Sequence, residues 1–183
     1  MNTSVPSSAQ RLPAPEPLRV VVDANIALAM FLVQRSHPSR QSAKRVLIPL
    51  LASSTFQWLW TPDILADYER GAQAIEQDTK IQRKAAFDRL GFELFLAALQ
   101  MFPAVTVSAT ALHAARQRIR QASRSRDRDL DDAIYLACAV DGQARLLTSE
   151  DSDLLNVGAT YETIQIVNWE RFAEELRQYQ LIP

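Results

Sequence analysis

Short, strongly apolar segments alternate with longer amphipathic ones along the 183-residue chain, and this alternation limits the fold more than any other feature. The first apolar segment, Leu18 to Val22, has the aliphatic character of a strand that is buried on both faces of a sheet. Strands that alternate with helices are typical of α/β domains with a parallel sheet, and we therefore expect that class of fold. The expected strands are 18–22, 56–60, 104–107, 145–148 and 163–167.

Capping residues and breaks mark the helices that we expect between these strands. Thr61 and Pro62 form an N-cap followed by a first-turn proline, and Ser108 and Asn168 are suited to cap two later helices. Gly91 should interrupt the long helical region after residue 78. The expected helices are 26–33, 38–51, one that begins at 62, 78–101, 108–120, 130–140, 153–156 and 168–179.

The first 17 residues differ from the rest of the chain in composition. They are rich in serine and proline and lack the apolar centre of a signal peptide, so we expect a disordered tail. Residues 18–183 are enough for one domain with a sizeable core. No apolar run approaches the ~20 residues of a membrane helix, and the single cysteine, Cys138, excludes an internal disulfide and a cysteine-rich zinc site. We expect a cytoplasmic protein.

Four acidic residues stand where an expected element begins or ends. Asp23 and Asp151 come just after strands, Asp132 opens an apolar helix, and Glu69 flanks the apolar stripe of the helix that begins at Pro62. In parallel sheets, ligands bind at the carboxyl ends of the strands. Carboxylates that converge there would repel one another, and a divalent cation would remove that penalty. The pattern therefore predicts a metal site, and hard carboxylate oxygens favour Mg²⁺ or Mn²⁺.

Each of these carboxylates also has a purely structural interpretation. Asp23 could cap the following helix. Asp132 could interact with the dipole of the helix that it opens, with Asp129 or Asp131 as the cap. Glu69 could be a solvated residue, with Asp67 and Glu76 as its competitors on the same helix. The apolar sequence beyond Asp132 and the Asp-Ala-Asn sequence at 23–25 favour the ligand interpretation for these two.

Several polar and basic residues are candidates for binding a phosphate. Residues 116–128 carry six arginines against one aspartate, directly before the acidic pair at 131–132, in a chain whose net charge is -1. Such a strip could hold a polyanion over a metal site, or it could be a solvated helix end and loop. Asn25 could orient Asp23 or contact a phosphate, and Ser149 could donate to one. The candidate substrate-binding residues are Asn25, Ser149, Arg124, Arg126 and Arg128.

Four segments that contain these acids resemble the motifs of PIN-domain ribonucleases, a family that includes the toxins of many bacterial toxin–antitoxin pairs. The similarity runs from about Leu18 to Glu170, and the order of the motifs agrees with that of the family. The segments are Val21-Val-Asp-Ala-Asn-Ile26, Thr61-Pro-Asp-Ile-Leu-Ala-Asp-Tyr-Glu-Arg70, Asp129-Leu-Asp-Asp-Ala-Ile-Tyr-Leu-Ala-Cys-Ala139 and Leu147-Thr-Ser-Glu-Asp-Ser-Asp-Leu-Leu155.

The resemblance implies a three-layer α/β fold with a central, mainly parallel, five-stranded sheet flanked by helices. It implies a metal-dependent endoribonuclease in which Asp23, Glu69, Asp132 and Asp151 are both catalytic residues and ligands of Mg²⁺ or Mn²⁺. One or two ions would lower the pKa of a water molecule and neutralise the phosphate. The family usually has one residue between the threonine of the fourth motif and its aspartate, but two intervene here, so Glu150 remains an alternative to Asp151.

The resemblance also suggests partners. It implies a homodimer and a cognate antitoxin protein able to occlude the acidic site. Residues 72–102 exceed a minimal toxin domain and are expected to form a helical clip or extension of the nuclease domain, 18–183. Large apolar residues in that extension would contribute to a dimer interface, or would instead thicken the core of the monomer. They are Phe87, Leu90, Phe92, Leu94, Phe95, Leu96 and Leu99.

Three other functions compete with the ribonuclease. A PIN-like module could bind RNA or protein without cutting, although it would not need to retain four costly acids. A receiver-like phosphoacceptor domain would need a lysine at the end of a late strand, and none follows the strand at 145–148. A haloacid-dehalogenase-like phosphatase would need a second aspartate where Asn25 stands.

Overall fold

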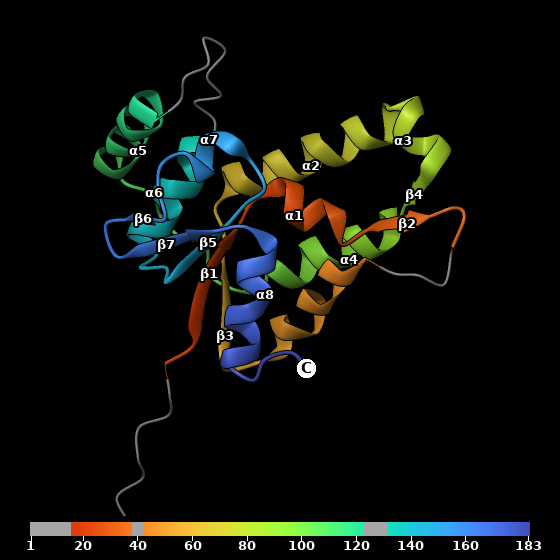
Figure 1. Ribbon diagram of the computed structural model, residues 1–183, viewed down its shortest axis with the longest axis horizontal. Coiled ribbons are helices and arrows are strands. Elements are labelled where there is room, and N and C mark those ends of the chain that lie inside the picture. Colours follow the sequence, from red (N-terminus) through yellow and green to blue (C-terminus); the bar gives the residue numbers. More distant parts are fainter. Residues whose placement is uncertain (1–15, 38–41, 123–131) are drawn as a thin grey trace, which may run out of the picture.

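The computed structural model describes residues 16–37, 42–122 and 132–183, and a five-stranded sheet lies at its centre (Figure 1). The strand order is β3-β1-β5-β7-β6, in which all neighbours are parallel except β6 and β7. This confirms the expected α/β fold with a mainly parallel sheet. The strands are β1 (Leu18–Val22), β3 (Phe56–Leu59), β5 (Leu146–Thr148), β6 (Thr160–Tyr161) and β7 (Ile164–Val167).

The order of the strands creates a crevice at the carboxyl edge of the sheet. The chain passes from β1 to β3 on one side and then to β5 on the other side of β1. Connections that leave two adjacent strands in opposite directions open a crevice between the ends of those strands. The residues that directly follow β1 and β5 therefore meet there, as the hydrogen bond from the Asp23 backbone N–H to the Thr148 carbonyl shows (2.9 Å).

Helices cover both faces of this sheet (Figure 1). On one face, α6 (Ala133–Asp141) packs against β1 and β5, with α5 (Ala109–Ala122) outside it. On the other face lie α8 (Trp169–Gln178) and a 3-10 helix, η1 (Ala43–Ala52). The remaining helices are α1 (Ala24–Ala29), α2 (Pro62–Gln77), α3 (Thr79–Lys84), α4 (Arg89–Leu99) and α7 (Ser152–Leu155).

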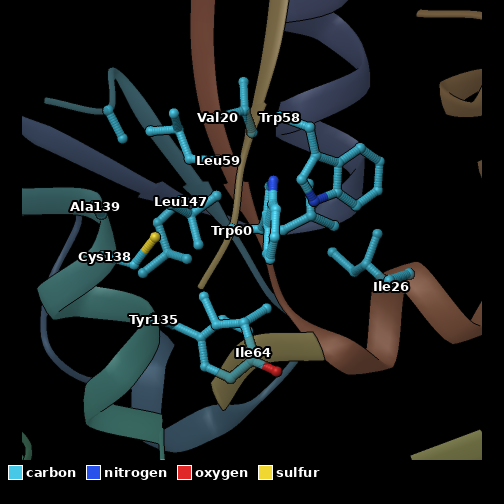
Figure 2. Close-up of a cluster of buried hydrophobic side chains, with 14 of the residues drawn as sticks. Val20, Ile26, Trp58, Leu59, Trp60, Ile64, Tyr135, Cys138, Ala139 and Leu147 are labelled. Atoms are coloured by element: carbon cyan, nitrogen blue, oxygen red, sulfur yellow. The ribbon is translucent and has the colours of Figure 1, made fainter. Parts of the chain in front are cut away.

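The core joins the sheet to α6 and to the helices at the carboxyl edge. Figure 2 shows Leu59 and Leu147 from the strands beside Tyr135 and Cys138 of α6, with Ile64 of α2 close by. All five are buried. Burying an aliphatic or aromatic side chain of this size stabilises the fold by about 1.5–3 kcal/mol. Helix α6 is apolar on nearly every side because it lies between the sheet, α2 and α5.

A second, smaller sheet replaces part of the helix expected at 26–33 and part of the region at 78–101. Strand β2 (Leu32–Gln34) pairs antiparallel with β4 (Ala85–Phe87). The pairing is fixed by an aromatic cluster beneath it, in which the Phe31 ring lies 5.5 Å from those of both Phe92 and Phe95. Such ring pairs add about 0.5–1.5 kcal/mol each to simple burial.

The predicted extension at 72–102 is therefore not wholly helical, and it does not simply protrude. Four residues of α4 are buried in the core: Phe92, Phe95, Leu96 and Leu99. Its break is β4 rather than Gly91, which lies in the first turn of α4 and donates its N–H to the carboxylate of Asp88 (3.0 Å). By contrast, Leu90 and Leu94 of the same helix are exposed. The residues of the extension thus divide between the core and the surface.

The prediction of a strand at 104–107 is wrong. Only Val105 of this segment makes a strand-like contact, by donating its N–H to the Trp60 carbonyl (2.8 Å), and the fifth strand is instead β6. The start of the helix expected at 38–51 and the start of that at 130–140 lie outside the described residues, as does most of the predicted tail. In the described part of the chain, no helix is long and apolar enough to cross a membrane.

Candidate acidic active site

Asp23 is the buried centre of the crevice. It follows β1 directly, caps α1, and is only 4 % exposed. Its Oδ1 accepts from the N–H of Ala24 (2.6 Å), and its Oδ2 accepts from Asn25 Nδ2 (2.6 Å) and from the hydroxyl of Ser149. The carboxylate is thus held in one orientation by groups from both strand ends. The capping role and the proposed ligand role belong to the same side chain.

Burial raises the pKa of the Asp23 carboxyl from 3.8 to about 6, because it removes the charged form from water. Hydrogen bonds from Ser149 and Ala24 work in the opposite direction, since they stabilise the carboxylate. The negative charges of Asp151 and Asp67 raise the pKa further. Acidic side chains from β1, α2 and the loop after β5 therefore influence one another at this edge.

The second acid near Asp23 is Asp67 of α2. Its carboxylate is half-buried; Oδ2 accepts from the hydroxyl of Tyr135 on α6 (2.5 Å), and Oδ1 accepts from Arg70 Nη2 (3.0 Å). The bond to Tyr135 joins α2 to α6 at the mouth of the crevice. This bond, together with the effect of Asp67 on the pKa of Asp23, places Asp67 on the inner side of α2.

Glu69, the residue predicted for this position, is exposed. It stands two positions beyond Asp67, which is about 200° around a helix. Its charge acts elsewhere: Arg89 has a raised pKa chiefly through its bond with Glu93, and Glu69 makes a smaller contribution to the same shift. The expectation that Glu69 faces the sheet is wrong, and the competitor Asp67 takes that place.

Asp132 stands at the N-cap position of α6 and is half-buried. Its side chain makes no capping hydrogen bond to the helix. It lies three residues before Tyr135, and residues three apart share a face of a helix. Asp132 is therefore on the side of α6 that bonds to Asp67. Asp129 and Asp131 lie outside the described residues.

The structure separates Asp151 from Glu150 after β5. Asp151 acts on the pKa of Asp23, caps α7 by accepting from the Asp153 N–H (2.6 Å), and donates its own N–H to Ser149 Oγ (2.8 Å). Glu150 faces α8 and η1 instead. Its Oε1 accepts from the Trp169 N–H (3.2 Å) and lies 3.8 Å from Lys44 Nζ. Of the two alternatives, Asp151 is the one beside Asp23.

Asn25 and Ser149 both donate a side-chain hydrogen bond to the carboxylate of Asp23. Asn25 donates to it while accepting, at Oδ1, from the Glu150 N–H (3.2 Å), and this favours the orienting role expected for Asn25. Ser149 is fully buried and donates inward to Asp23, so its hydroxyl is not available to a phosphate in this arrangement. The predicted phosphate-binding arginines Arg124, Arg126 and Arg128 lie outside the described residues.

The chemistry of the donor set suits a hard divalent cation. Carboxylate oxygens of Asp23, Asp67 and Asp151 are the type that Mg²⁺ and Mn²⁺ prefer, and a cation would favour the ionised form that burial disfavours. Within the described ranges, no three acidic, histidine or cysteine side chains already stand together as a metal-binding group. Asp67 bonds to Tyr135 and Asp151 caps its own helix, so both side chains would turn to bind an ion.

Comparison with known proteins gives a match to a protein family. The family model of the PIN domain matches residues 19–153, a span that covers most of the chain and includes Asp23, Asp67, Asp132 and Asp151. A search of curated proteins found no match.

Proposed function

The chain belongs to the PIN-domain family, and from this premise we propose that it is a metal-dependent endoribonuclease, which hydrolyses RNA phosphodiester bonds. The observation that carries the proposal is the buried Asp23, whose pKa is raised to about 6 by burial and by the carboxylates of Asp151 and Asp67. Such an arrangement destabilises the fold unless a cation compensates it. A purely structural role for these acids does not require the charges of Asp151 and Asp67 to act on the same buried carboxylate.

The proposed ligands of Mg²⁺ or Mn²⁺ are Asp23, Asp67 and Asp151, with Asp132 as the fourth acid. A bound ion would supply positive charge that lowers the pKa of a water molecule and neutralises the phosphate. Asn25 and Ser149 hold the central carboxylate in a fixed orientation, which lowers the entropy lost on binding an ion.

Tyr135 has a related positioning role in this proposal. Its hydroxyl donates to Asp67 and so ties the second acid to α6, the helix that begins at Asp132. Burial raises the pKa of Tyr135 well above its ordinary value, and this keeps the hydroxyl protonated as a donor.

We assign the biological role of a toxin of a toxin–antitoxin pair to the same activity. This assignment rests on the resemblance of the motifs to such toxins, and the partner would be an antitoxin protein that covers the acidic crevice. The alternative function is a PIN-like module that binds RNA or protein without cutting. The carboxylates of Asp67 and Asp151, which both raise the pKa of the buried Asp23, favour the enzyme over this alternative.

A homodimer is also part of the proposal, through the exposed face of α4. An apolar groove of about 660 Å³ lies between α4 and η1, lined by Ile48, Leu51 and Leu94 among others. Side chains that protrude beside the groove are exposed by 63 % at Leu94 and 85 % at Met101. A face that carries both a groove and protruding apolar groups can pack against itself about a two-fold axis.

The nuclease proposal is tested by cleavage of RNA with added Mn²⁺, with and without a chelator. We expect cleavage that stops with the chelator and is lost in the Asp132→Asn variant. Asp63→Asn is the matched control, because Asp63 is an exposed aspartate in the first turn of α2. Binding of RNA without any cleavage by the folded wild-type protein would instead support the binding module.

A further inference from the structure

An open cavity of about 1010 Å³ lies beside the end of α1 that is remote from Asp23. Ala29, the last residue of α1, lines it, whereas Asp23 directly precedes the first. Because α1 has six residues, the two places are separated by roughly 9 Å of helix. This distance is short enough for one polymer chain to occupy both the cavity and the acidic crevice.

Among the described residues that line the cavity, three are cations and none is a carboxylate: the cations are Arg35, Arg83 and Lys84. All three are exposed, and no ion pair engages any of them in the described part of the chain. Arg35 is held by its Nε–H, which donates to the Gln82 carbonyl (2.6 Å). Uncompensated positive charge in a concave surface attracts and concentrates anions.

A fourth cation, Lys44, lies next to the cavity lining in the chain but is engaged. Ser42 and Ala43 at the start of η1 also line the cavity, and Lys44 follows them. Lys44 Nζ lies 3.8 Å from Glu150 Oε1 and 5.8 Å from the centre of the Trp169 ring. Lys44 is therefore paired with Glu150 at the start of α8, and its charge is not free for an anion.

We propose that this cavity holds the phosphate backbone of a single RNA strand next to the point of cleavage. The identity of the polymer rests on the proposed nuclease function, but the binding itself needs neither metal nor cleavage. The carboxylates at Asp23 repel a polyanion, and the row of cations offsets that repulsion on one side of them. A concave surface with dispersed cations suits the successive phosphates of one strand.

The rival surface for the strand is the arginine-rich region that begins on α5. Arg118 of that helix is already engaged, since its guanidinium donates to the Val157 carbonyl. Arg116 and Arg120 are exposed on α5, which packs on the α6 side of the sheet, away from β2 and β4. The two surfaces therefore predict different effects of substitution.

The experiment measures the affinity of a short, fluorescent, single-stranded RNA for the full chain, in a chelator and over a range of salt concentrations. The test variant is Arg83→Ala/Lys84→Ala, and the control with the same change in charge is Arg116→Ala/Arg120→Ala. Each lost phosphate contact lowers the salt slope of log K by about 0.7 for a single strand, so we expect a decrease of about 1.4 for the test variant. A loss of affinity and slope no larger than that of the control would overturn the proposal.

The design separates this proposal from the nuclease function. Binding of RNA in a chelator does not depend on catalysis. If the wild-type protein never cleaves RNA but the test variant binds RNA more weakly, the nuclease function is contradicted and the cavity remains the binding surface. If the wild type cleaves RNA and the test variant binds it unchanged, the proposed role of the cavity is contradicted and the nuclease function remains. Both residues are exposed and make no side-chain bond within the described ranges, so the variant should fold.

Discussion

Substitution of Asp23 by asparagine should remove cleavage and at the same time stabilise the protein above neutral pH. Asparagine has nearly the shape of aspartate, but it carries no charge to bury. The wild-type carboxyl is 4 % exposed and has a pKa of about 6 in place of 3.8. At about 1.4 kcal/mol for each unit of pKa, ionisation of Asp23 destabilises the metal-free fold by about 3 kcal/mol.

The direction of the pH dependence follows from the raised pKa. The folded state holds this proton more tightly than the unfolded state, so the stability of the wild type falls as the pH rises from 3.8 through about 6. The variant has no such group and escapes this loss. One contact of the new amide is unfavourable, because its NH2 must take the place of an oxygen that accepts either from the Ala24 N–H or from Asn25 Nδ2, and this costs about 1 kcal/mol.

The net expectation is a variant that is more stable than the wild type by about 2 kcal/mol near pH 8, with the difference lost or reversed near pH 4. Urea unfolding in a chelator, followed by the fluorescence of the buried Trp58 and Trp60, measures this difference. Asp63→Asn is the control for the removal of an exposed charge. If the stability difference between Asp23→Asn and wild type is the same at both pH values, the ionised, buried carboxylate is refuted.

Two further predictions concern the second acid and association. Asp67→Asn should lower the rate of RNA cleavage by on the order of a hundredfold, the usual effect of removing one electrostatic partner from an active site. Glu69→Gln, on the exposed side of the same helix, should leave the rate unchanged. Equal losses of rate in the two variants would restore Glu69 as a site residue. Light scattering should give a mass near twice 20.6 kDa for the wild type and near 20.6 kDa for Leu94→Asp, which places a charge in the proposed interface; a wild-type mass of 20.6 kDa would contradict the dimer.

Sequence patterns were sufficient wherever the structure depends on neighbours in the chain. The predictions of β1 from its apolar run and of helix caps at Thr61 and Asn168 are confirmed, because strand burial and helix capping depend on residues within a few positions. The position of Asp23 after its strand followed in the same way. Since the ends of parallel strands share an edge, its proximity to Asp151 could also be predicted.

The choice between Asp67 and Glu69 could not be made from the sequence. Both residues flank Tyr68, whose side chain is fully buried, and the apolar pattern of α2 is the same whichever flank faces the crevice. The rotation of α2 about its axis decides which of the two residues faces the crevice. That rotation is fixed by contacts with other elements. The hydrogen bond from Tyr135, 68 positions further along the chain, is one of these.

The sequence by itself thus determined the α/β class, four of the five strands of the main sheet and the place of the acids in it. Tertiary structure alone decided which acids act on Asp23, the pairing of β2 with β4, and the replacement of the strand expected at 104–107 by β6. The physical reason is that short edge strands and the facing of a helix gain their stability from partners far away in the chain. The local pattern of a segment carries no record of those partners.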